Sequence, residues 1–352
     1  MRVAFAYPNP RASLLREVAE GRAPDTALFG QNHLAKHGID AQVVDSVLRR
    51  GRRASGTLHR LTWNARELAL PFELRRFDAV FTSLTTLLPL VARLRGGPRV
   101  VLLNYHLLTA DDRAGPARRR LLRACVSAAA GVVCAAESAR GRLIDRFELD
   151  PERVQTALLG VDERWWQSVP PTPEGYVLAV GRDLARDYGT FARALDGLPV
   201  RGIVVAKREN LEGIRLPANV EARLDISPAE VRDLYSGALC AVIPVRRSGS
   251  AIGTENSGTI SLLEAMACAR PVIVSENEYL ADYLRPGADA LTVPPEEPDA
   301  LRAALELLLA DRPLVQRLGT AARHSVEQRH TTRLFAARLA EILRSFLKEE
   351  AT

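Results

Sequence analysis

The chain has 352 residues, 47% of them apolar and 26% charged, with a formal net charge of +6 and a pI near 9.4. This length exceeds what one typical hydrophobic core supports and suits two domains. No window approaches the roughly 18 uncharged apolar residues of a membrane-spanning helix, and the N-terminal stretch MRVAFAYPNP lacks the apolar region of a signal peptide.

The basic charge is almost entirely arginine. Of the 48 basic residues only Lys36, Lys207 and Lys348 are lysine, which leaves 45 arginines and indicates coding bias rather than a polybasic surface. Residues 49–53 read RRGRR and residues 118–123 read RRRLLR; each fits a solvated helix face, and the alternative is a weak contact with an anionic membrane surface or a phosphorylated acceptor. No aromatic residues interleave with these arginines, which argues against nucleic acid as a partner.

The first half of the chain alternates strand-like and helical segments. Helical patterns such as DTALFGQNHLAKHG, residues 25–38, separate the strands, and Gly38 is a helix stop signal. Such alternation predicts a parallel sheet covered by helices on both faces. The loop at residues 8–25, after the first strand, is where we expect contacts with an acceptor. The strand-like runs lie at residues 2–7, 41–45, 79–83, 99–103, 131–135 and 154–159.

A proline-rich stretch then divides the chain. Residues 165–176, WWQSVPPTPEGY, contain three prolines in a polar setting and predict a linker. Alternation restarts at residue 176, and helical patterns at 298–310, 313–328 and 332–348 close the chain. We therefore predict an α/β fold of two doubly wound, Rossmann-like domains, residues 1–166 and 167–330, with a C-terminal helix in 331–352 that can cross back to the first domain. Ligands in such sheets bind beyond the carboxyl ends of the strands.

Residues 253–274, GTENSGTISLLEAMACARPVIV, carry the clearest chemistry. Small residues lead into a helix expected to begin near Gly258, with Ser257 available as its cap. The amides of residues 258–260 lack intrahelical partners at the positive end of the helix dipole, which suits a phosphate. Glu264, one turn further, can accept hydrogen bonds from vicinal hydroxyls such as those of a ribose. The alternative is an ordinary exposed glutamate after a plain connector.

These residues resemble the family-4 retaining glycosyltransferases. The hallmark of that family is a Glu, seven residues, and a second Glu inside LLEAMA…G.PVI, and this chain has LLEAMACARPVIV with Glu264 at the second position. The segments AAGVVCAAESARGRLIDRFELDPERVQTALLGVDERWW, YVLAVGRDLARDYGTFARAL, AEVRDLYSGALCAVIPV and GADALTVPPEEPDALRAAL are also similar. The resemblance is strong from about residue 129 to 345 and implies the GT-B fold, in which the two domains face each other across a cleft.

The resemblance implies transfer of a sugar from a nucleoside diphosphate sugar to an acceptor hydroxyl. Glu264 would hold the ribose, and His106, just beyond a strand end of the first domain, would lie near the reacting carbon. The resemblance also assigns the diphosphate to Ser257, Gly258, Thr259, Ile260, Arg182 and Arg186.

The chain departs from the family pattern in three places. Asn256 stands where the family has its first Glu, which touches the donor sugar, so either Asn256 fills that role as an amide or Glu255 turns in. The family lysine falls on Asp187, so Arg186 or Lys207 would supply the cation. Ala269 replaces the glycine that precedes PVI, a difference we expect to affect only packing.

Other features limit the chemistry. Asp162, in the Gly-Val-Asp loop, either approaches the cleft or stabilises its turn. No Asp-x-Asp triplet or His/Cys cluster has metal-ligand spacing, so we expect no metal and no cofactor besides the sugar nucleotide. The four cysteines (Cys125, Cys134, Cys240 and Cys268) show no paired spacing, which predicts reduced thiols in a cytoplasmic protein, peripheral at the inner membrane face if the arginine clusters touch lipid.

Two alternatives to glycosyl transfer stay open. A sugar-nucleotide epimerase of the same architecture would turn over the donor alone. A catalytically silent GT-B module would only bind nucleotide or a partner protein, and Asn256 is its main support. The acceptor is a glycan, a lipid-linked glycan or a small molecule, and the sequence does not distinguish among them.

Overall fold

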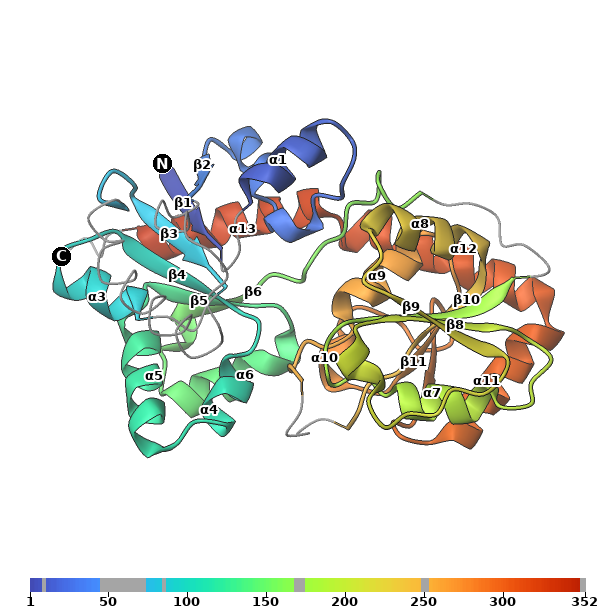
Figure 1. The fold of residues 1–352 in the computed structure, drawn as a ribbon. Coiled ribbons are helices and arrows are strands. Elements are labelled where there is room, and N and C mark those ends of the chain that lie inside the picture. Colours follow the sequence, from blue (N-terminus) through green and yellow to red (C-terminus); the bar gives the residue numbers. More distant parts are fainter. Residues whose placement is uncertain (8–10, 45–73, 84–86, 168–174, 248–252, 349–352) are drawn as a thin grey trace. The chain divides into compact units, whose positions relative to one another are not determined.

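The computed structural model describes residues 1–7, 11–44, 74–83, 87–167, 175–247 and 253–348. The chain divides into two compact units (Figure 1). Unit 1 contains residues 1–19, 28–158 and 335–352, and unit 2 contains residues 20–27 and 159–334. The sequence pattern predicted domain boundaries after residues 166 and 330, whereas the compact units of the structure divide after residues 158 and 334.

Unit 1 is built on a six-stranded parallel sheet with the strand order β2-β1-β3-β4-β5-β6. Strands β3 and β5 are buried along their whole length, as expected for a parallel sheet covered on both faces. Helices α5 and α6 lie on one side of this sheet and α13 on the other (Figure 1). The elements are β1 (Arg2–Ala6), α1 (Ala12–Ala19), η2 (Gln31–His37), β2 (Asp40–Val43), β3 (Ala79–Thr82), α3 (Leu88–Leu94), β4 (Arg99–Asn104), α4 (Leu107–Asp112), α5 (Pro116–Ala128), β5 (Gly131–Cys134), α6 (Glu137–Phe147), η4 (Pro151–Arg153), β6 (Val154–Thr156) and α13 (Thr332–Leu347).

Unit 2 contains a second six-stranded parallel sheet, with the order β12-β11-β10-β7-β8-β9. Helices α7 and α11 cover one face, and α8, α9 and α12 cover the other (Figure 1). Buried side chains such as Phe191 on α7 and Leu305 on α11 join the strands in one core. The elements are β7 (Tyr176–Val180), α7 (Tyr188–Leu195), β8 (Gly202–Ala206), η5 (Arg208–Leu211), β9 (Val220–Leu224), α8 (Pro228–Gly237), β10 (Ala238–Ile243), α9 (Thr259–Ala267), β11 (Val272–Ser275), α10 (Glu278–Ala281), β12 (Leu291–Val293), α11 (Pro298–Ala310) and α12 (Arg312–Arg329).

The strand order of unit 2 points to its ligand site. From β7 the chain moves outward to β8 and β9, and it then returns to β10 and moves outward in the opposite direction to β11 and β12. Ligands of open α/β sheets bind beyond the carboxyl ends of the strands where the order reverses. Here that position lies between the loops that follow β7 and β10.

One predicted helix of the first half is wrong. Residues 25–38 form two short 3-10 segments, η1 (Thr26–Leu28) and η2, rather than one α-helix. Phe29, with φ of 48°, and Gly30, with φ of 73°, are both left-handed, and this conformation cannot continue a right-handed helix. Gly38 does end η2, in the left-handed conformation expected of a stop.

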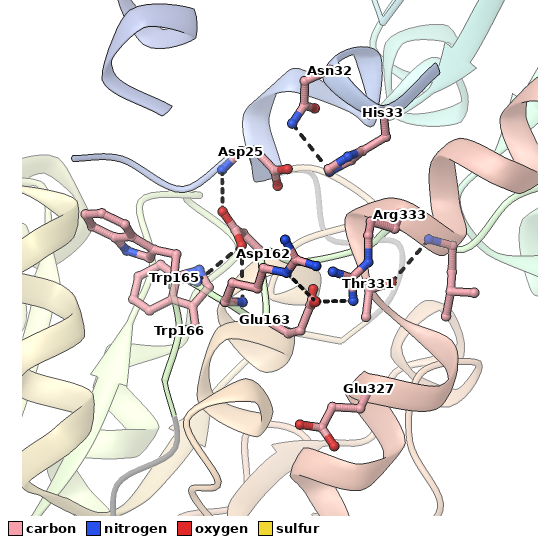
Figure 2. A network of polar contacts seen from close by, with 12 residues as sticks. Asp25, Asn32, His33, Asp162, Glu163, Trp165, Trp166, Glu327, Thr331 and Arg333 are labelled. Carbon is pink, nitrogen blue, oxygen red and sulfur yellow. Dashed lines mark hydrogen bonds and ion pairs between the residues drawn. The ribbon is translucent and has the colours of Figure 1, made fainter. Parts of the chain in front are cut away.

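Three segments of unit 2 are tied together at its junction with the rest of the chain. The amide of Asp25 donates to Oδ2 of Asp162 at 3.1 Å (Figure 2). The amide of Asp162 donates to Oγ1 of Thr26 at 3.2 Å. Val161 pairs with Thr331 in a parallel bridge. Oδ1 of Asp162 also accepts the amides of Arg164 and Trp165, each at 3.2 Å, so Asp162 stabilises its own turn and holds residues 20–27 against the rest of unit 2.

The predicted linker lies partly outside the described residues. Its start is not exposed chain: Trp165 is 8% and Trp166 1% exposed, and the Trp166 ring meets Tyr235 edge-on at 5.7 Å. Residues 168–174 of the linker and the arginine cluster at 49–53 are outside the described ranges.

Candidate functional site

The loop after β7 holds a buried arginine. Arg186 is 2% exposed, and its side chain lies across Gly181, where a Cβ atom would collide with Nε. Its Nη2 donates to the carbonyl of Val180 and to Oγ of Ser261, which is 2.9 Å away. The other terminal nitrogen, Nη1, is buried and has no hydrogen-bond partner in the described chain. An unsatisfied buried guanidinium is costly, so Nη1 is a candidate contact for an anion.

The amino end of α9 lies beside this guanidinium. Gly258 precedes the helix with φ of 95°, and a Cβ atom there would lie 2.9 Å from Cγ2 of Ile243 and 3.1 Å from Nη1 of Arg186. Glycine is therefore required for both its backbone conformation and its size. The amides of Gly258 and Ile260 make no hydrogen bond to the residues described here. Two N–H groups at the positive end of a helix dipole remain available to an anion.

Two details of this loop differ from the expectation. Ser257 does not cap the helix: Gly258 occupies the cap position without a side-chain hydrogen bond, and Oγ of Ser257 is buried without a partner. The amide of Thr259 donates to the Asn256 carbonyl at 3.3 Å, and Oγ1 of Thr259 donates to the same oxygen at 3.1 Å. The tight turn through the left-handed Gly258 accounts for both differences and removes the Thr259 amide from the set of free donors.

Glu264 lies on α9 one turn beyond Ile260. It is half-buried, while its neighbours Leu263 and Ala265 are fully buried. Burial raises the pKa of Glu264 to about 8, and the charges of Arg186 and Arg182 act in the opposite direction. Glu264 therefore interacts with the charges of both arginines and is partly removed from solvent, unlike an ordinary exposed helix residue.

The two candidates for the sugar-contacting position precede the helix. Asn256 is 4% exposed, and Glu255 is half-buried. Asn256 is thus the more buried of the two. Its carbonyl is already used to hold the start of α9, so a sugar contact would fall to its side chain.

The remaining cations of unit 2 lie at the edge of the site. Arg182 is exposed, follows β7, and donates from Nη2 to the carbonyl of Ile226 at 3.0 Å. Lys207 follows β8, and its Nζ lies 3.6 Å from Oε1 of Glu209. Arg182 is the better placed of the two, because its charge reaches Glu264 and the ammonium of Lys207 is already paired.

Asp183 is a residue of this site that the sequence reasoning missed. Its Oδ1 accepts from the amides of Ala185 at 2.8 Å and Thr254 at 3.1 Å, and its Oδ2 accepts from Oγ1 of Thr254 at 2.9 Å. Its carbonyl accepts from the amide of Arg186 at 3.2 Å and from Nδ2 of Asn210 at 2.9 Å. A turn-forming Asp directly after Gly-Arg was the available signal, but its partner is 71 positions away.

His106 belongs to unit 1. It follows β4 and occupies the position before α4, with an extended φ of −168°. Burial lowers the pKa of His106, and the nearby Arg113 lowers it further, so the imidazole is neutral near pH 7. Because β4 ends at Asn104, His106 lies beyond the carboxyl end of a unit 1 strand, as expected.

The arginine cluster on α5 is partly a structural feature. Asp111 is 1% exposed and lies 3.6 Å from Arg119, 3.8 Å from Arg123 and 3.0 Å from Arg146. Two arginines of the cluster therefore neutralise a buried carboxylate rather than face solvent freely. Within the described residues, no helix is both long and apolar enough to cross a bilayer.

Comparisons with known families match both halves of the chain. Residues 18–165 match the family described as Glycosyltransferase Family 4, and residues 206–325 match Glycosyl transferases group 1. A D-inositol 3-phosphate glycosyltransferase of Streptomyces bingchenggensis (strain BCW-1) is 30% identical over 131 residues, which are 36% of this chain. That match spans only 27% of the length of the relative.

Solved structures resemble the chain over almost its whole length. Sucrose-phosphate synthase from Thermosynechococcus elongatus has a TM-score of 0.74 at 14% identity, and the match covers 98% of each chain. HepE of Anabaena, solved in complex with UDP-glucose, has a TM-score of 0.69 at 13% identity, covering 98% of this chain and 100% of HepE. At these identities the likeness establishes the fold.

Proposed function

Since this chain belongs to the family-4 glycosyltransferases and has their GT-B fold, we propose that unit 2 binds a nucleoside diphosphate sugar and that the enzyme transfers the sugar to an acceptor hydroxyl with retention of anomeric configuration. One observation carries this proposal. The unsatisfied Nη1 of Arg186 and the free amide of Gly258 lie together at the amino end of α9, and the charges of Arg186 and Arg182 act on the half-buried Glu264 further along the same helix.

The diphosphate would occupy the space beside Gly258. Nη1 of Arg186 and the amides of Gly258 and Ile260 supply donors, and the exposed Arg182 adds positive charge at the rim. Fixed cations and helix-end amides stabilise a departing diphosphate without solvent reorganisation. We therefore propose that transfer needs no metal ion and no cofactor besides the sugar nucleotide.

With the diphosphate beside Gly258, the ribose and the sugar of the donor would contact Glu264 and the residues before α9. The ionised carboxylate of Glu264 accepts hydrogen bonds from the two ribose hydroxyls, and the Asn256 side chain, or Glu255, contacts the sugar. An amide at Asn256 both donates and accepts, whereas an ionised carboxylate only accepts. The donor sugar would therefore differ from one selected by a glutamate at that position.

Retention is proposed to occur by attack on the same face of the sugar. The bond from the anomeric carbon to the phosphate oxygen breaks as the acceptor oxygen bonds to that carbon, and the acceptor proton passes to the leaving phosphate oxygen. The neutral His106 would orient the acceptor hydroxyl or the sugar. Exposed α5 residues such as Arg118 and Arg120 would give weak attraction to an anionic membrane if the acceptor is lipid-linked.

Calorimetry with sugar nucleotides tests the proposal. HepE has been solved with UDP and UDP-glucose, so uridine compounds are the first probes, followed by guanosine and thymidine diphosphate sugars. We expect micromolar binding by the wild-type chain and a loss of about tenfold or more in Glu264→Ala. Glu306→Gln, on α11 at the exposed pair with Arg302, is the matched control and should bind normally.

The outcomes separate the candidate functions. No heat with any sugar nucleotide would contradict the proposal. Binding followed by conversion of the donor alone to an epimer would favour the epimerase. Binding without transfer to any glycan, lipid-linked or small-molecule acceptor would favour the silent module.

A further inference from the structure

We infer that Asp183 is a positioning residue that sets donor affinity by holding two segments of the donor site against each other. The inference rests on the proposed donor site in unit 2. One segment is the turn after β7, which carries Arg186, and the other is the loop that leads into α9. Asp183 itself would not touch the ligand.

The carboxylate of Asp183 connects the two segments directly. It accepts the amide of Ala185 within its own turn, and it accepts both the amide and the hydroxyl of Thr254 from the other loop. Two of these three donors come from the other loop, a connection that an isolated turn does not require. Gly253 completes the contact, because a Cβ atom there would collide with Oδ1 of Asp183 and with Ala185.

A chain of hydrogen bonds then runs from Thr254 to the start of α9. The Thr254 carbonyl accepts the amide of Ser257 at 3.1 Å, and the Asn256 carbonyl accepts the amide and hydroxyl of Thr259. These bonds fix the backbone on both sides of Gly258. The position of the free Gly258 amide therefore depends on the Asp183–Thr254 contact.

The backbone of Asp183 fixes the other segment. Its carbonyl accepts the amide of Arg186 at 3.2 Å and Nδ2 of Asn210 at 2.9 Å, and Oδ1 of Asn210 in turn accepts the Lys207 amide at 3.1 Å. Asp183 thus fixes the backbone position from which the Arg186 side chain extends, and it also fixes the position of Gly258. If Nη1 of Arg186 and the Gly258 amide are to bind the same anion, the distance between these two donors must be fixed.

Substitutions at the contact separate positioning from bulk stability. Asp183→Ala removes all three side-chain bonds, and Thr254→Val removes only the hydroxyl bond. Asp183→Asn is the conservative variant, because its Oδ1 still accepts both amides and its Nδ2 donates to the Thr254 hydroxyl. Asp311→Ala is the matched control: Asp311 caps α12 in the same unit through the amide of Leu314 at 2.9 Å, away from the donor loops.

Three measurements are made on each folded variant: affinity for UDP-glucose or whichever sugar nucleotide the wild type binds, KM and kcat for transfer, and the melting temperature. We expect Asp183→Ala to weaken donor binding by about tenfold to a hundredfold, Thr254→Val by less, and Asp183→Asn to restore most of the affinity. KM should rise more than kcat falls. Asp311→Ala should lower the melting temperature and leave affinity unchanged.

The results that would overturn the inference are distinct from those that contradict the proposed function. Wild-type binding together with unchanged affinity in folded Asp183→Ala would make Asp183 an ordinary turn residue. Absence of wild-type binding would remove the donor site and the inference with it. Should Asp183→Ala not fold, Thr254→Val against Thr254→Ser decides, because only valine lacks the hydroxyl; equal affinity in these two would overturn the inference.

Discussion

The carboxyl group of Glu264 is an unusually weak acid. Its pKa is raised by burial to about 8, although Arg186 and Arg182 oppose the change. Near pH 7 most molecules therefore carry a protonated Glu264, and the ionised fraction grows as the pH rises. The ionised form offers both oxygens as acceptors to two ribose hydroxyls, whereas protonation turns one of those oxygens into a donor.

Donor affinity should consequently increase with pH. We expect binding of a nucleoside diphosphate sugar to tighten by about tenfold between pH 7 and pH 9 and then to level off. Calorimetry at constant ionic strength measures this directly. Glu264→Gln, which cannot ionise, should show a flat profile, and a wild-type affinity that falls with rising pH would argue against the ribose role of Glu264.

At the scale of the element, α9 ends at a strained residue. The amide of Arg270 donates to the Ala265 carbonyl at 2.9 Å, and the amide of Ala269 donates to the Met266 carbonyl at 3.0 Å. These are the two bonds of a Schellman motif, with Ala269 left-handed at φ of 55°. Glycine suits this position because the backbone is left-handed there, so the expectation that alanine affects only packing is wrong.

Ala269→Gly should stabilise unit 2. A left-handed alanine costs about 1–2 kcal/mol, and glycine avoids this at a smaller entropic cost, so we expect the free energy of unfolding to rise by about 1 kcal/mol. Urea denaturation measures the change. Ala303→Gly, at an exposed position of α11, is the control and should lower the free energy of unfolding by about 0.5–1 kcal/mol; a fall in both variants would show that the strain at Ala269 is absent.

The elements that the sequence predicted well are those with local signals. Strands such as β3, β4 and β5 were predicted from their apolar runs, and α11 has the bounds expected from its periodicity and its proline at the first turn. Strand β9 was not predicted, because its sequence VEARL is mostly exposed and has no apolar run. The break at Phe29 and Gly30 was missed because the pattern around it is helical and a left-handed phenylalanine has no composition signal. Asp183 was missed for a different reason, since a hydrogen bond between residues 71 positions apart follows from strand order rather than from local sequence.

At the scale of the whole molecule, a buried histidine links acidity to stability. His330 follows α12, is 0% exposed, and lies 5.2 Å from the ring of Tyr283. Burial, together with the charge of Arg329, lowers the pKa of His330 to about 3, whereas an unfolded histidine titrates near 6.5. Between these values the unfolded chain binds a proton that the folded chain does not.

The free energy of unfolding should therefore decrease as the pH falls below about 6.5, by up to about 1.4 kcal/mol per pH unit from this group alone. Urea denaturation of the wild type and of His330→Phe at several pH values tests this through the difference between their slopes. The same substitution at exposed His324 on α12 is the control. Parallel slopes for the wild type and His330→Phe would exclude His330 as the cause of acid sensitivity.

The division of the chain has a consequence for biosynthesis. Unit 1 includes residues 335–352, and the ring of Phe346 lies where a Cβ atom on Gly131, at the start of β5, would collide with it. These residues are translated after unit 2, so unit 1 cannot finish folding until the segment that follows unit 2 has been made. Most of unit 2, by contrast, is one continuous stretch. A chain that stops just before α13 would therefore expose apolar surface on an incomplete unit 1, which makes truncation at this point a route to aggregation rather than to a folded, shorter enzyme.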